Sequence, residues 1–162
     1  MTEPAAWVRA LDDKERKAVV NKCNQARKLL AELGIDVPPD PTGHIAAIAR
    51  ARAACTTPPA RLKKAEVLGF LWMHTVDAST SWKWMAWAWA SGARMMLFNQ
   101  DRSRCVDGVQ LIRIGPTRTH GLGDDYIEEI FRALPALDAD TFKRLVGCGI
   151  VKGAAHLPQH PR

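Results

Sequence analysis

The stretch SWKWMAWAW at residues 81–89 limits the fold more than any other part of the chain. It holds four of the six tryptophans, Trp82, Trp84, Trp87 and Trp89. In a helix these indoles would point in every direction, whereas a strand places successive side chains on opposite faces. We therefore expect a strand with Trp82 and Trp84 on one face and Trp87 and Trp89 on the other.

The residues that follow predict a small antiparallel sheet. Ser91-Gly92 is a turn signal, ARMMLF at 93–98 has the composition of a second strand, and NQDRS is a polar turn. Residues 105–114 resume a strand pattern, which gives a meander of three strands. A one-residue bulge near Met85–Ala86 would bring all four indoles to one face of this sheet.

Helical patterns come before and after the sheet. Residues 12–33 carry apolar side chains at helical spacing, and Asp12 with Glu15 has the spacing of a capping box. The apolar face of this helix consists of Val19, Cys23, Ala26, Leu30 and Leu33.

Four further helices follow the same reasoning. We expect one over 43–54, capped by Thr42, and one over 58–76, capped by Thr57 with Pro58 behind it. Gly69 is costly inside a helix, so it predicts close packing against another element. After the sheet, a helix starts at Asp124 or Asp125 and ends at Pro135, and a shorter one starts at Asp138.

This order of elements predicts an α+β fold with helices packed on one face of the sheet. We expect one domain over 1–155, made of a helical part (about 1–57) and a helix–sheet–helix part (about 58–150), followed by a flexible tail at 156–162. No apolar run approaches the roughly 20 residues that span a bilayer, and no export signal opens the chain. We therefore expect a cytoplasmic protein with reduced cysteines, of which Cys23 and Cys55 are buried.

Positive charge is concentrated near the N-terminus. Residues 1–64 hold 12 lysines and arginines against 7 acidic residues, whereas 65–162 hold 11 against 10. A basic surface suits nucleic acid or an acidic protein partner, but it is also typical of a solvated helix without a specific role. The residues that would contact nucleic acid are Lys14, Arg16, Lys17, Lys22, Arg27 and Lys28.

The order of motifs in the central region resembles a known kind of domain. LGFLWMHTV is followed by WKWMAWAW, RMMLFNQDRSRCVDGVQLIRI and DDYIEEIFRAL. Over about residues 66–134 this arrangement resembles small bacterial domains of unknown function, and it is similar in style to the immunity proteins of contact-dependent and secreted toxin systems. The resemblance implies an α+β fold and a protein partner, and it implies no catalytic residues.

The tryptophan cluster allows three interpretations. Its indoles can form the core between the sheet and the helix at 58–76, an exposed partner-binding face, or a base-stacking platform with Lys83 and Arg94. On the partner-binding interpretation, the contacts extend to the 98–104 turn and to the loop GPTRTHGLGDD. The predicted partner-binding residues are Trp82, Trp84, Trp87, Trp89, Arg102, Arg104, Arg118 and His120.

Patterns for other chemistry are weak. The glycines of GPTRTHGLGDD precede a helix, but Asp124 and Asp125 occupy the positive end that an anion would need. His156 and His160 have a metal-ligand spacing that Pro158 interrupts. We expect neither a metal nor a cofactor. The sequence predicts a non-enzymatic protein-binding protein, foremost an immunity-type inhibitor of a toxin or effector, with a basic nucleic-acid-binding accessory protein as the alternative and an enzyme of unknown class as the third possibility.

Overall fold

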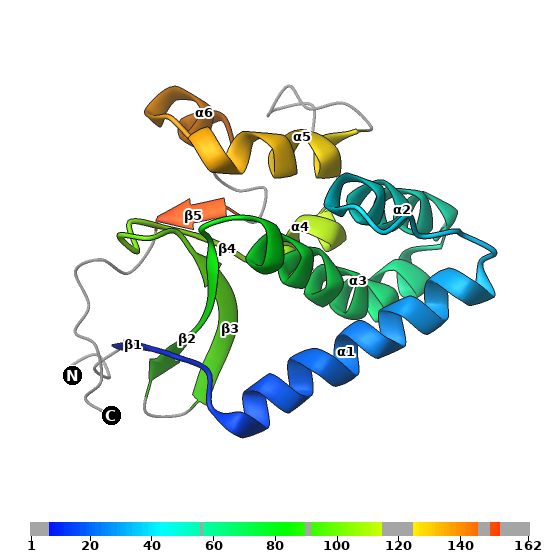
Figure 1. Ribbon diagram of the computed structural model, residues 1–162, viewed down its shortest axis with the longest axis horizontal. Coiled ribbons are helices and arrows are strands. Elements are labelled where there is room, and N and C mark those ends of the chain that lie inside the picture. Colours follow the sequence, from blue (N-terminus) through cyan, green and yellow to red (C-terminus); the bar gives the residue numbers. More distant parts are fainter. Residues whose placement is uncertain (1–6, 56, 90–91, 115–124, 146–149, 153–162) are drawn as a thin grey trace.

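The computed structural model describes residues 7–55, 57–89, 92–114, 125–145 and 150–152. Helices and strands alternate in groups along the chain (Figure 1), which confirms the α+β class. The elements are β1 (Trp7–Arg9), α1 (Asp13–Glu32), α2 (Pro41–Ala54), α3 (Pro58–Ser79), β2 (Lys83–Trp89), β3 (Gly92–Phe98), β4 (Arg104–Val106), α4 (Gly108–Ile114), α5 (Tyr126–Ala133), the 3₁₀ helix η2 (Leu134–Ala136), α6 (Ala139–Leu145) and β5 (Ile150–Lys152).

The sheet has five strands in the order β1-β2-β3-β4-β5, and each neighbouring pair is antiparallel. The expectation of three strands was therefore wrong. The two additional strands lie at the ends of the sheet and contain three residues each. Such short strands carry no alternating pattern, and only pairing with residues far away in the sequence makes them strands.

The tryptophan strand β2 is regular. It pairs with β3 from Lys83 opposite Phe98 to Trp89 opposite Gly92 without interruption. The ladder has no bulge near Met85–Ala86, so Trp84 and Trp87 lie on opposite faces of the sheet, as the alternation of a regular strand predicts.

Helices cover one side of the sheet. Figure 1 shows α3 beside the sheet, and α1 and α2 pack against α3. The helix-facing side of β2 carries Trp84 and Ala86, which join the main core with Trp72 of α3. Trp87 points to the other side, where it packs against a small second cluster that includes Val8 and Phe98. The prediction that helices pack on the sheet is thus confirmed.

The glycine inside α3 lies where another helix crosses closely. A Cβ atom built on Gly69 would come within 2.6 Å of the backbone N and Cα of Val109, in α4. One built on Gly108 would come within 2.7 Å of the Gly69 carbonyl oxygen. The prediction that close packing explains Gly69 is confirmed, and the element that packs there is α4.

That helix replaces most of a predicted strand. Residues 105–114 were expected to be extended, but only Arg104–Val106 form β4. Asp107 ends the strand because its carboxylate accepts hydrogen bonds from the backbone N–H groups of Val109 (3.0 Å) and Gln110 (3.2 Å). A carboxylate in this position caps a helix N-terminus, and α4 begins at the next residue.

The first helix has the predicted start. The Asp12 side chain accepts from Glu15 N at 2.8 Å, and the Glu15 side chain accepts from Asp12 N at 2.9 Å, which completes the capping box. The second helix begins earlier than expected. Its cap is Asp40, which accepts from Gly43 N at 2.9 Å, rather than Thr42. No helix in the described part of the chain is long and apolar enough to cross a membrane.

Replacing Asp12 by alanine is expected to lower the free energy of unfolding by about 1 kcal/mol, because one N-terminal N–H of α1 loses its acceptor. Equilibrium urea unfolding measures this loss. Asp13→Ala is the matched control, since Asp13 is exposed and makes no cap bond. Equal losses in the two variants would show that the capping box does not stabilise α1.

Candidate functional site

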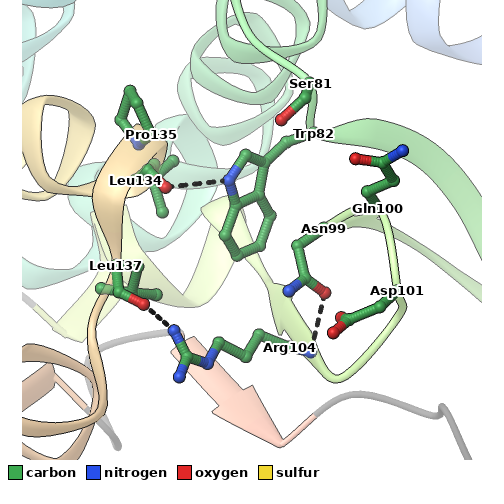
Figure 2. Close-up of a pocket in the computed structure, with 9 residues that line it drawn as sticks. All are labelled: Ser81, Trp82, Asn99, Gln100, Asp101, Arg104, Leu134, Pro135 and Leu137. Atoms are coloured by element: carbon green, nitrogen blue, oxygen red, sulfur yellow. Dashed lines mark hydrogen bonds between the residues drawn. The ribbon is translucent and has the colours of Figure 1, made fainter.

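A pocket of about 490 Å³ lies between the β3–β4 turn and the segment that joins α5 to α6 (Figure 2). Both polar and apolar side chains face it, and two charged residues are among them. We call it the turn site. Its lining residues are Ser81, Trp82, Asn99, Gln100, Asp101, Arg104, Leu134, Pro135 and Leu137.

The β3–β4 turn is held by its own polar side chains. Asn99 exchanges hydrogen bonds with Arg104: its N–H donates to the Arg104 carbonyl (3.1 Å), and its Oδ1 accepts from Arg104 N (2.9 Å). The Asn99 side chain also donates to Ser103 Oγ at 3.1 Å, and the Asp101 carboxylate accepts from Ser103 N at 2.9 Å. These bonds fix the turn in one conformation, which lowers the entropy that a binding partner would have to remove.

Arg104 connects this turn to the opposite wall. Its Nη1 donates to the carbonyl oxygen of Leu137 (Figure 2), and its guanidinium carbon lies 4.8 Å from the centre of the Phe142 ring. A hydrogen bond and a cation–π contact therefore hold one side chain between β4 and α6. Arg104 thus contacts both walls of the pocket.

Trp82 forms the base of the site. Its side chain is 2% exposed, and its Nε1 donates to the Leu134 carbonyl oxygen at 3.2 Å (Figure 2). A buried indole whose N–H has a partner supports the wall and is not an exposed anchor.

Arg102 has the most unusual conformation in the turn. Its φ angle is 59°, the left-handed region that side-chain-bearing residues adopt at a cost of roughly 1 kcal/mol. The Nη1 atom of Arg102 is buried, and no residue in the described ranges accepts a hydrogen bond from it. The backbone of Arg102 is therefore strained, and the Nη1 donor of its guanidinium has no described acceptor.

Two carboxylates beside the site remain ionised at neutral pH. Hydrogen bonds from Ser103 lower the pKa of Asp101, and hydrogen bonds from Thr141 lower the pKa of Asp138. The positive charge of Arg104 contributes to both shifts. The turn site thus offers both signs of charge within one hollow.

The structure brings together only some of the predicted partner-binding residues. Trp82 and Arg104 line the turn site, and Arg102 belongs to its turn. Trp84 is half-buried on the helix-facing side, with its ring 5.5 Å from Phe70, and Trp87 is half-buried on the other side, 6.1 Å from Phe98. The Trp89 side chain, Arg118 and His120 lie outside the described residues.

The sequence did not predict the apolar wall of the site. Leu134, Pro135 and Leu137 follow α5 in the sequence, and nothing in their pattern indicates that they lie beside a turn more than 30 residues earlier. Asn99 and Asp101 have a recognisable signal, because such residues hold turns through side-chain bonds to the backbone.

The turn site presents amide, hydroxyl, carboxylate and guanidinium groups beside apolar surface. In the part of the chain that the structure describes, no three histidine, cysteine, aspartate or glutamate side chains are grouped so as to hold a metal ion. Burial raises the pKa of the Cys23 thiol to about 11 and that of Cys105 to about 12, so these thiols stay protonated.

Comparison of the chain with protein-family models, curated proteins and solved structures finds no match.

Proposed function

We propose that this chain is a non-enzymatic protein-binding protein of the immunity type, which inhibits a toxin or effector by binding it through the turn site. The observation that carries this proposal is Arg102. A strained backbone and an unused buried guanidinium donor both cost free energy, and such costs are found where function requires them. A partner that draws the Arg102 side chain outward and supplies an acceptor would recover part of this cost.

The charges indicate what kind of partner fits. The chain has a formal net charge of +6, and Arg102 and Arg104 belong to the turn. Complementary charge speeds association and selects among partners, so we expect an acidic partner. A carboxylate of that partner would accept from the guanidinium of Arg102, which is half-buried in the turn that carries Asn99, Gln100 and Asp101 of the site.

The alternative is a nucleic-acid-binding accessory protein, and one observation favours it. Lys14 and Lys17 are exposed on α1, and no carboxylate forms an ion pair with either of them in the described part of the chain. The remaining basic residues of α1 fit this role less well. Lys22 pairs with Glu66 at 3.1 Å, and Lys28 lies 4.0 Å from Glu32. Arg16 donates to the Leu11 carbonyl oxygen and Arg27 to the Asn24 side chain.

Affinity capture from the native lysate distinguishes the two functions. The tagged chain is used with and without nuclease treatment, beside Arg102→Gly and the control Arg50→Ala, an exposed arginine on α2. We expect one stoichiometric acidic protein that survives nuclease, that Arg50→Ala retains and that Arg102→Gly loses. Recovery of nucleic acid alone would contradict the proposed function and support the alternative.

A further inference from the structure

One edge of the long hairpin has backbone groups without a neighbouring strand. β3 pairs with β2 along its whole length, but with β4 only at Leu97 and Phe98. Gly92, Ala93 and Arg94 are exposed, and Met95 is half-buried. Within the described ranges, the residues from Gly92 to Met96 therefore have a strand on one side only.

The register shows which groups point away from β2. The Asn99 N–H donates to the Arg104 carbonyl, so the backbone groups of Asn99 face β4. These directions alternate along an antiparallel strand, so the N–H and C=O of Met95 and Ala93 face the same edge. Beyond the end of β4 this edge thus offers two donors and two acceptors to an added strand.

The opposite edge of the hairpin is different. β2 also extends past β1, because β1 pairs only with Ala86, Trp87 and Ala88. A pocket of about 430 Å³ lies there, however, and its walls include Arg16 and Val19 of α1 beside Trp84. The first helix thus approaches this part of β2, whereas no described strand pairs with the β3 edge from Gly92 to Met96.

The charge at the centre of the β3 edge indicates its occupant. Arg94 is 56% exposed, and its Nε lies 3.4 Å from a carboxylate oxygen of Asp107. In a second copy paired antiparallel about this centre, Arg94 would lie opposite its own counterpart, and like charges directly opposite each other are destabilising. A strand that carries a carboxylate at this position would instead gain an ion pair.

We infer that the β3 edge accepts an extended peptide segment of a partner protein as an added antiparallel strand. An acidic residue of the segment lies opposite Arg94, and apolar residues lie opposite Ala93 and Met95. Main-chain hydrogen bonds provide the affinity, and the side chains opposite β3 provide the specificity. This surface is separate from the turn site and does not depend on it.

The probe is the synthetic peptide acetyl-GTVEVTG-amide, titrated into the ¹⁵N-labelled chain. We expect amide shift changes concentrated at Gly92–Phe98. The peptide GTVKVTG should bind about tenfold more weakly, because lysine then lies opposite Arg94. Arg94→Glu should reverse this preference. Absence of shifts at millimolar peptide would overturn the inference. So would an affinity that stays the same after the lysine replacement in the peptide and after Arg94→Glu.

Methylated peptides test the hydrogen bonds without altering the protein. In the added strand the N–H groups of both valines face β3, whereas that of the glutamate faces away. Methylation of both valine nitrogens should abolish binding, and methylation of the glutamate nitrogen should leave it within about twofold. The opposite order would overturn the inference. Arg102→Gly should not affect this binding, so peptide binding at the β3 edge and partner binding at the turn site can be refuted separately.

Discussion

Arg102→Gly is expected to weaken binding of the captured partner by about 2 kcal/mol, or roughly 30-fold in Kd. The same substitution should leave the free energy of unfolding within about 1 kcal/mol of the wild-type value. Glycine adopts the φ angle of 59° without strain, and its greater freedom in the unfolded chain offsets this gain. Titration calorimetry and urea unfolding measure the two quantities.

This separation of affinity from stability is specific to a binding role. Arg50→Ala controls for the loss of one positive charge and should change neither quantity, because Arg50 is exposed on α2. Unchanged partner affinity in Arg102→Gly would show that the guanidinium is not a contact. A large loss of stability would show that Arg102 holds the turn together.

Gly69→Ala is expected to lower the free energy of unfolding by about 3 kcal/mol, even though alanine favours helices. The added methyl group would lie within 2.6 Å of the Val109 backbone, so α3 and α4 would have to separate. Because many core contacts depend on that crossing, Tm should fall by about 10 °C. Scanning calorimetry measures both effects.

The matched control is Gly92→Ala. A Cβ atom at Gly92 meets no atom within 4 Å, so this variant should keep its stability within about 0.5 kcal/mol. A comparable loss in both variants would mean that the cost reflects glycine replacement in general. A stable Gly69→Ala would contradict the close crossing of α3 and α4.

Local signals were enough to predict most helices. Asp12 with Glu15 predicts one helix start and Asp138 predicts another. The structure confirms both, because Glu15 N donates to Asp12 and Thr141 N donates to Asp138. The error at 105–114 also has a local cause. The apolar pattern of residues 105–114 predicts a strand, but Asp107 before Gly108 is itself a signal for a helix cap.

The sheet and the candidate site depend on contacts that the sequence does not show. β1 becomes a strand because Val8 lies opposite Trp87. The base of the turn site forms because Trp82 bonds to the carbonyl of Leu134. Residue types alone placed Trp82, Arg102 and Arg104 among the binding residues. Only the geometry shows that Trp82 is buried, that Arg104 bonds to the Leu137 carbonyl and that Arg102 has a donor without an acceptor.

Hydrogen–deuterium exchange with the captured partner shows whether the turn site binds a protein. We expect slower exchange at residues 99–104 and at Leu137, with no change in exposed amides along α1. Exchange that slows along α1 while the 99–104 turn stays as in the free chain would contradict this expectation and place the interface on the basic helix.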